Sequence, residues 1–161
     1  MEHNTNWYWS VTAVVIREGK VLLARHTYGG GKGLLIVPGG YVESGETPQD
    51  AVVREYREET GIEIAPREII GIRFNLHDWY IAFAADYMVG EARSDGDENS
   101  EVVWIDVEEA ITREDVPDLT KKLIVCALSF DQGLREIPYN GSMKNGPYSF
   151  YGTSLNHNEM R

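Results

Sequence analysis

"GYVESGETPQDAVVREYREETGI", residues Gly40 to Ile62, is the stretch that decides the fold. Thr47 is a good helix N-cap, Pro48 suits the first helical position, and Asp50 completes a pattern like a capping box. Gly61 is well placed to end the helix. The stretch therefore predicts a glycine-containing loop followed by a helix from Thr47 to Thr60.

The predicted helix carries three glutamates on one face. Glu55, Glu58 and Glu59 are spaced i, i+3 and i+4, and at about 100° per residue their carboxylates project together. Like charges so close repel one another, and a solvated helix face would alternate its signs. Divalent cations among the carboxylates would explain the clustering, and oxygen ligands suit Mg²⁺ or Mn²⁺. The face therefore predicts a metal site.

Residues around this face support the same interpretation. Gly39 and Gly40 allow the backbone to approach a ligand or metal closely. Glu46 adds a carboxylate just before the helix. Arg54 lies four residues before Glu58 and is placed to orient its carboxylate.

The spacing of these residues resembles the Nudix box, G-x5-E-x7-R-E-U-x-E-E-x-G-U, in which U is a bulky aliphatic residue. Ile62 fills the last U, whereas Tyr56 stands where an aliphatic residue is usual, and we expect it to pack under the helix. Seven fixed positions match: Gly40, Glu46, Arg54, Glu55, Glu58, Glu59 and Gly61.

The rest of the chain reads as strands and one further helix. β-branched and aromatic residues predict strands, and the apolar run near residue 124 predicts the second helix. The strands are predicted over 9–27 with a turn at Arg17 to Lys20, then 34–37, 67–78, 79–91 and 101–107, and the helix over 117–130. Strands interleaved with two helices predict an α/β fold, and the resemblance implies a Nudix-type α/β/α sandwich with a mixed β-sheet.

The chain shows no internal repeat and no linker. We expect one Nudix hydrolase domain over residues 1–134, and a polar, irregular C-terminal tail of the same domain over 135–161. The tail, rich in Gly, Asn, Ser and Tyr, is either a long surface excursion or the cover of a partner surface.

The resemblance implies a MutT-like, metal-dependent pyrophosphohydrolase that cleaves a nucleoside diphosphate linked to another moiety X. It implies that Glu55, Glu58 and Glu59 hold Mg²⁺, for which Mn²⁺ can substitute, with the Gly39 carbonyl as a further ligand. It also implies a catalytic glutamate from a loop outside the box. Glu98, in the acidic loop "DGDENSEVVW", is preferred over Glu101, which looks like the start of a strand. Glu55 is the third candidate for the base.

Substrate contacts are less sharply defined. Lys32, in "GGGKG", is a candidate phosphate contact, although the run lacks the serine or threonine of a P-loop. Trp79 and Tyr80 are candidates for stacking on a nucleobase. Tyr80 lies 18 residues after the box, where dinucleoside polyphosphate hydrolases of the family often carry a tyrosine. A nucleoside triphosphate sanitiser, a dinucleoside polyphosphate hydrolase and a non-catalytic nucleotide sensor remain alternatives.

Composition limits the partners. The net charge is −11, with 15 basic and 26 acidic residues, so broad contact with nucleic acid or an anionic membrane is disfavoured. No apolar run approaches the roughly 20 residues needed to span a bilayer, and the N-terminus lacks the pattern of a signal peptide. With the single Cys126, these features predict a cytoplasmic protein that takes a nucleotide-type small-molecule substrate. A homodimer is left open.

Overall fold

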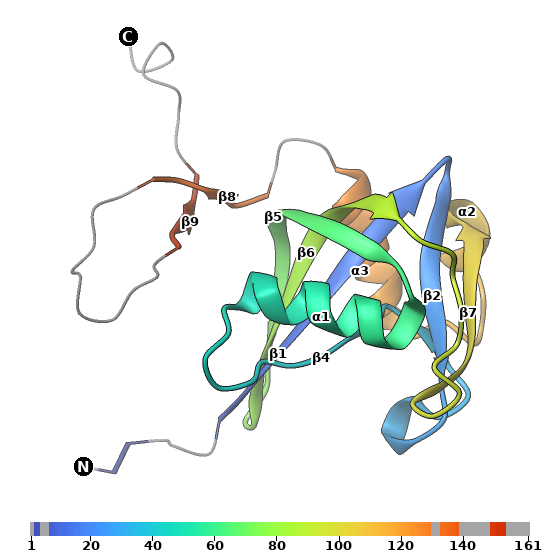
Figure 1. Cartoon of the computed structure of the whole chain (residues 1–161), viewed down its shortest axis with the longest axis horizontal. Coiled ribbons are helices and arrows are strands. Elements are labelled where there is room, and N and C mark those ends of the chain that lie inside the picture. The colour runs from blue at the N-terminus through green and yellow to red at the C-terminus, as the bar shows by residue number, and fades with distance from the viewer. Residues whose placement is uncertain (1, 4–6, 130–132, 139–148, 154–161) are drawn as a thin grey trace, which may run out of the picture.

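The computed structural model describes residues 2–3, 7–129, 133–138 and 149–153 of the 161-residue chain. Figure 1 shows its elements. The strands are β1 Tyr8–Arg17, β2 Lys20–His26, β3 Leu35–Ile36, β4 Gly39–Tyr41, β5 Glu63–Phe74, β6 Asp78–Val89, β7 Asn99–Asp106, β8 Arg135–Glu136 and β9 Tyr151–Gly152. The helices are α1 Pro48–Thr60, α2 Val107–Ala110 and α3 Asp118–Leu128, with a 3₁₀ turn, η1, at Gly29–Gly31.

β1 lies at the centre of a seven-stranded sheet. It pairs with β2 and β4 in antiparallel fashion and with β6 in parallel, and the order is β3-β2-β1-β6-β5. β7 adds to β2 through an antiparallel ladder. The predicted mixed sheet is therefore confirmed. β-branched residues make half of β1 and suit such a doubly covered strand.

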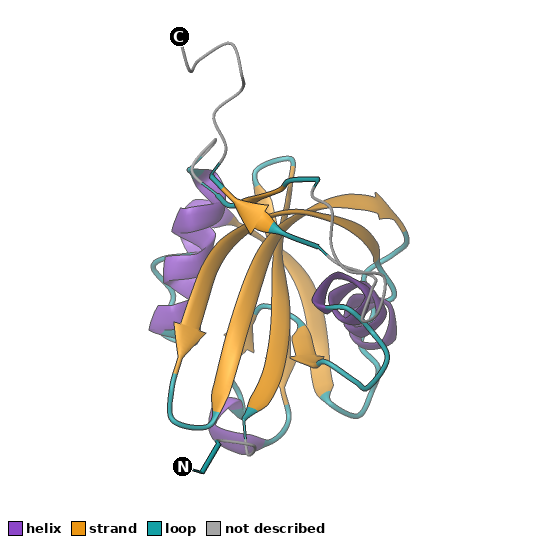
Figure 2. Ribbon diagram, turned by 90° about the vertical axis from the view of Figure 1, so that its left-hand side faces the viewer, coloured by secondary structure: helices purple, strands orange, loops and turns teal. Residues whose placement is uncertain are grey.

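Helices cover the two faces of the sheet. Val11, Ala13 and Val15 of β1 are fully buried in the cluster that includes Ala51, Val52 and Tyr56 of α1. Val14 points the other way and packs in the cluster of Leu123 and Ile124 of α3. Alternation along a strand sends successive side chains to opposite faces, so a single strand supplies both cores. α1 lies in front of the sheet and α3 behind it (Figure 1), and Figure 2 shows helices on both sides. The α/β/α sandwich is confirmed.

Several predicted boundaries need correction. The strand predicted to begin at residue 67 begins at Glu63, because the chain leaves α1 directly into β5. The strand predicted for 101–107 is Asn99–Asp106, and a short helix that was not predicted, α2, begins at Val107. Part of the predicted 38–46 loop forms β4, whose residues pair with Ser10, Val11 and Thr12. The end of the second predicted helix, at residue 130, lies outside the described residues.

The C-terminal tail is less irregular than predicted, in the part that the structure describes. β8 and β9 pair antiparallel, and Leu134 forms a bridge with Ile69 of β5. The Tyr151 hydroxyl accepts a hydrogen bond from the Gln49 amide of α1 (3.0 Å), and its ring meets that of Phe83. These contacts place residues from the tail against the α1 side of the core. The assignment of 135–161 to the same domain stays a prediction.

None of the helices that the structure describes is long and apolar enough to cross a membrane.

Candidate metal centre

α1 is fixed at both ends by the residues that the sequence suggested. The Thr47 hydroxyl accepts a hydrogen bond from the Asp50 N–H (3.2 Å), and Gly61 adopts the left-handed conformation with φ of 74°. Tyr56 is fully buried, and its hydroxyl donates to the Ala13 carbonyl. The expectation that Tyr56 packs under the helix is therefore confirmed, and its partner satisfies the buried hydroxyl.

Two glycines let β4 lie close to its neighbours. A Cβ built on Gly40 would lie 2.5 Å from the Glu55 carboxyl carbon, and one built on Gly39 would lie 2.1 Å from the Val11 carbonyl oxygen. A larger residue at Gly39 would therefore collide with the backbone of β1, and one at Gly40 would displace the Glu55 carboxylate. The close approach places backbone atoms of residues 39–40 beside the Glu55 side chain.

Three carboxylates converge at this point. One ligand atom each from Glu55, Glu59 and Glu98 lies within 4.8 Å of the others. Glu59 is buried, Glu55 is half-buried and Glu98 is exposed. α1 supplies two of the acids, and the turn before β7 supplies the third. These are three of the residues that the sequence selected.

The cluster is electrostatically unfavourable as it stands. Burial, then the charges of Glu55 and Glu98, raise the pKa of Glu59 to about 9, although a hydrogen bond from the Gly39 backbone opposes the shift. Burial also raises the pKa of Glu55, against the opposing influence of Arg54. Carboxylates shift in this way when charge is desolvated and like charges crowd together. A bound cation would reverse both effects.

Arg54 frames the cluster from one side. Its guanidinium bonds both oxygens of Glu46 (3.0 and 2.7 Å), Glu55 (2.9 Å), and the Tyr41 carbonyl (3.1 Å). The bidentate bond to Glu46 fixes the plane of the guanidinium. Hydrogen bonding from Arg54 lowers the pKa of Glu46, which is therefore an anion that orients Arg54. Arg54 in turn fixes the Glu55 carboxylate.

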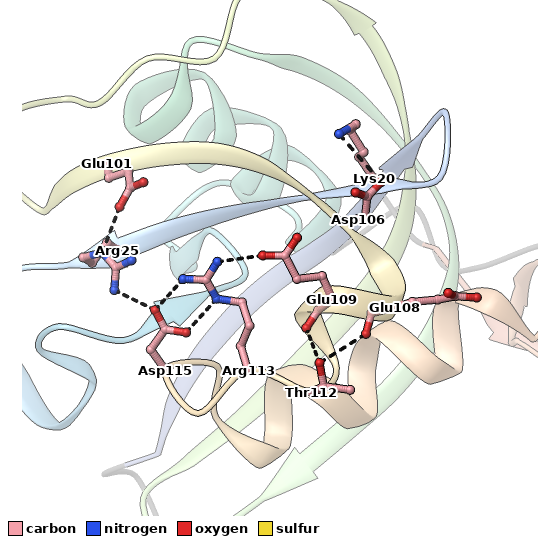
Figure 3. Close-up of polar contacts among 9 residues, drawn as sticks. All are labelled: Lys20, Arg25, Glu101, Asp106, Glu108, Glu109, Thr112, Arg113 and Asp115. Carbon is pink, nitrogen blue, oxygen red and sulfur yellow. Dashed lines mark hydrogen bonds and ion pairs between the residues drawn. The ribbon is translucent and has the colours of Figure 1, made fainter.

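Glu58 and Glu101 lie outside the three-carboxylate group. Glu58 is the most exposed of the three helix acids, with 60% of its side chain accessible, and its partner is Arg54 (3.3 Å). Glu101 sits within β7 and bonds Arg25 of β2 (2.8 Å), as Figure 3 shows. The sequence preference for Glu98 over Glu101 agrees with this placement, because only Glu98 approaches the helix acids.

The candidate substrate contacts do not form one surface. Trp79 packs against Trp7, Trp9 and Phe74. Tyr80 is the next residue of the same strand, so its side chain points to the opposite face, among the residues of the α3 core. The two rings therefore cannot sandwich one base. Lys32 is exposed, directly after η1.

Tyr28, which follows β2, is a neighbour of the acid cluster that was not predicted. Its ring stacks on His26 (5.7 Å between centroids). Burial, then the charges of Glu98, Glu59 and Glu55, raise the pKa of the Tyr28 hydroxyl, so the phenol lies near the acid cluster. The register of β2 against β7 brings this segment beside residues 97–99, and nothing in the local sequence indicates that pairing.

The donor set fits a hard divalent cation. The three acids offer oxygen ligands from a rigid helix and a bonded turn, which is the chemistry that Mg²⁺ and Mn²⁺ prefer. The raised pKa of Glu59 follows from the same burial and crowding, and a nearby cation would stabilise its anionic form. Glu55 and Glu59 of α1 would hold the ion, and Glu98 lies within reach of the same position.

Comparison with known proteins identifies the family. The model of the NUDIX domain matches residues 8–124, which contain α1, α2, the first part of α3 and the whole acid cluster. The chain therefore belongs to the NUDIX family.

Curated relatives share about a third of their residues with the chain. An ADP-ribose pyrophosphatase of Methanocaldococcus jannaschii is 33% identical over 104 residues, covering 61% of each chain. An NAD-capped RNA hydrolase, NudC, of Photobacterium profundum is 31% identical, covering 84% of this chain and 49% of that protein. A CTP pyrophosphohydrolase of Escherichia coli is 36% identical, covering 63% and 77%. The chain spans less than two thirds of the length of the first two relatives.

Solved structures agree with the fold. The MutT protein of Methanosarcina mazei superposes with a TM-score of 0.63 at 27% identity, covering 77% of this chain and 94% of that one. A NUDIX hydrolase from Nitrosomonas europaea gives a TM-score of 0.68 at 24% identity, covering 76% and 70%. The second likeness bears on the fold alone.

Proposed function

We propose that the chain is a metal-dependent pyrophosphohydrolase that cleaves a phosphoanhydride bond of a nucleoside diphosphate linked to another moiety X. The observation that carries the proposal is the convergence of Glu55, Glu59 and Glu98 within 4.8 Å. Similarity to an ADP-ribose pyrophosphatase and a CTP pyrophosphohydrolase supports it. Both of those activities are the hydrolysis of a phosphoanhydride bond in a nucleotide.

The main electrostatic difficulty of this reaction is that substrate and site are both negative. Three carboxylates repel a diphosphate unless a cation lies between them, and the net charge of −11 adds to the repulsion. A bound Mg²⁺ or Mn²⁺ would neutralise phosphate oxygens and lower the pKa of a nearby water. Glu55 and Glu59 would hold that ion, with Glu58 and the Gly39 carbonyl as further candidate ligands. Arg54 would keep Glu55 in position through its bonds to Glu46.

Glu98 is the proposed base. It is exposed at the edge of the cluster, where a water molecule has access, and a general base must reach the proton that it removes. Glu101 is engaged with Arg25 and is the weaker candidate. Glu55, half-buried and bonded to Arg54, remains the alternative inside the helix.

The first alternative function is a nucleoside triphosphate sanitiser or a dinucleoside polyphosphate hydrolase, which would use the same acids on a different substrate. A non-catalytic nucleotide sensor is the alternative of another class, but retention of every box carboxylate disfavours it. Likeness to NAD-capped RNA hydrolases raises RNA ends as a substrate, against which the net charge argues. Whether the protein acts as a homodimer, and its cytoplasmic location, stay predictions.

A panel of substrates tests the proposal. ADP-ribose, NADH, diadenosine polyphosphates and the common nucleoside triphosphates would be incubated with Mg²⁺ or Mn²⁺, and nucleotide or phosphate products would be separated and measured. The proposal predicts metal-dependent release of a nucleoside monophosphate from at least one diphosphate-linked compound. Binding of nucleotides without product from any member would favour the sensor.

A further inference from the structure

The turn that carries Glu98 is fastened to its neighbours on two sides. The Thr27 N–H donates to the Glu98 carbonyl (3.1 Å), and the Thr27 hydroxyl donates to the Asp97 carbonyl (2.6 Å). The Asp95 carboxylate accepts hydrogen bonds from the N–H groups of Asp97 and Asn99 (2.9 and 3.1 Å). Backbone atoms on both sides of the Glu98 side chain are therefore held before any ligand binds.

Asn99 joins this turn to the helix that carries the other acids. Its Nδ2 donates to the Glu59 carbonyl (2.9 Å), near the C-terminal end of α1. Asn99 is only 1% exposed, although it begins a strand beside an exposed acidic turn. One buried amide thus links the backbone of Glu59 to the residue next to Glu98.

The register of the sheet explains how Asn99 comes to point inward. Arg25 pairs with Glu101, whereas the adjacent His26 pairs with Asn99, so Ser100 is an extra residue in β7. A bulge of this kind bends a strand and changes the direction of its side chains. Here Glu101 remains on Arg25, while Asn99 is directed to α1.

The other end of the Asn99 amide has no partner. Its Oδ1 is the buried side-chain oxygen or nitrogen without a hydrogen bond among the residues that the structure describes. The Glu59 carbonyl requires a donor, which fixes Nδ2 toward it and leaves the buried Oδ1 on the other side of the amide. A buried amide with an unused acceptor adds little to stability, so stability alone does not account for asparagine here.

We infer that Asn99 is a positioning residue, which sets the distance between Glu98 and the Glu55–Glu59 pair. This inference rests on the proposed function, in which the acid cluster binds the metal ion and supplies the base. The carboxylate of Glu98 is then placed in advance by the bulge, by Asn99 and by Thr27. The acidic turn does not need to close over the substrate to deliver it.

The test compares Asn99→Leu with the core variant Ile124→Val. Leucine matches asparagine in shape and removes the bond to Glu59, whereas Ile124 is buried behind the sheet, in the α3 core. Three quantities are measured for each: melting temperature, Mn²⁺ affinity without substrate by electron paramagnetic resonance, and kcat with KM. For Asn99→Leu we expect Mn²⁺ affinity and kcat each to fall about tenfold, the effect typical of groups that orient metal ligands, with little change in KM.

Ile124→Val should leave Mn²⁺ affinity and kcat at the wild-type level, whatever its melting temperature. Asn99→Leu with wild-type Mn²⁺ affinity and kcat would overturn the inference, and so would equal losses in both variants.

If Asn99→Leu does not fold, Thr27→Val is the deciding variant, because it removes the hydrogen bond of the Thr27 hydroxyl and keeps the bond from the Thr27 N–H to the Glu98 carbonyl. A fall in kcat supports the inference, and unchanged kcat overturns it. Absence of metal-dependent turnover in the wild type would instead contradict the proposed function.

Discussion

Two groups of charged side chains lie on either side of β2 and β7. One pairs its acids with arginines, and the other brings acids close to one another. In one, Arg25 lies between Glu101 (2.8 Å) and Asp115 (3.2 Å), and Arg113 bonds Asp115 and Glu109. Figure 3 shows this network, in which each of the acids has an arginine beside it. In the other, Arg54 bonds Glu55, and no arginine among the described residues bonds Glu59 or Glu98.

The pKa shifts express the same difference. Hydrogen bonding from Arg113 holds the pKa of Asp115 well below its usual range. Burial and like charge raise the pKa of Glu59 to about 9. Ion pairs of the first kind stabilise the fold. The crowded acids of the second kind are electrostatically unfavourable until a bound cation neutralises them. Glu98 and Glu101 are three residues apart, yet Glu98 belongs to the crowded acids and Glu101 to the ion-paired group.

Removal of the metal should have the largest effect on turnover, because the function proposed for Glu55, Glu59 and Glu98 depends on a bound cation. Treatment with EDTA is expected to lower turnover by at least about 10³-fold, because neither charge neutralisation nor water activation is then available. Product release from the best substrate is measured before chelation, after it, and after Mg²⁺ or Mn²⁺ is restored. Turnover that persists in protein freed of metal would contradict the metal assignment.

The variants Glu98→Gln and Glu101→Gln compare a crowded acid with an ion-paired acid in the same segment. We expect Glu98→Gln to lower kcat by about 10²-fold with little change in KM, as for loss of a general base. Glu101→Gln should act mainly on stability, through Arg25. A silent Glu98→Gln beside an inactive Glu101→Gln would transfer the role of base to Glu101. Two silent variants would place it in the helix, with Glu55 the first candidate.

Glu58→Gln is expected to have an intermediate effect. Its side chain is 60% exposed and bonded to Arg54, so its removal changes the charge near the metal without removing one of the three converging carboxylates. Turnover should fall by about tenfold, between the effects of ligand loss and of a surface change. The fold should survive, because Glu58 is exposed and its removal takes one negative charge from a helix face that also carries Glu55 and Glu59. Thermal unfolding checks this, and a variant that unfolds would indicate that the helix face is structural.

Asp115→Asn tests the paired group and should not affect turnover. It removes the acid shared by Arg113 and Arg25, which should lower the melting temperature by a few degrees. The folded-state pKa of Asp115 lies below its unfolded value, so its contribution is present above about pH 4 and is lost as the pH falls further. The gap between wild type and variant should therefore shrink in melts below pH 4. A gap independent of pH would contradict the ion-pair explanation.

The sequence predicted the parts of the molecule that depend on local spacing. The N-cap at Thr47, the end of α1 at Gly61 and the convergence of Glu55 with Glu59 follow from residues within one helix. Glu58, which was predicted to join them, lies outside the three-carboxylate group. The burial of Tyr56 followed from its place in the box. These features need no knowledge of distant contacts.

Other features depend on pairing between distant segments and could not be predicted. The bulge opposite His26 determines that Asn99 turns inward, and it exists only where β2 meets β7. The nearness of Tyr28 to the acids has the same origin. β4 was predicted as loop, because its short glycine-rich sequence has no strand pattern and its partners are in β1. The pairing of β8 with β9 joins residues about fifteen positions apart in a polar tail.

The most direct test of the central claim is Mn²⁺ binding to Glu59→Gln and Glu101→Gln in the absence of substrate. Free Mn²⁺ is measured by electron paramagnetic resonance over a titration of each variant and of the wild type. If the unpaired acids form the metal centre, Glu59→Gln should bind Mn²⁺ at least about tenfold more weakly than the wild type, and Glu101→Gln should bind it as the wild type does. Equal binding by all three proteins, or an equal loss in both variants, would contradict the account.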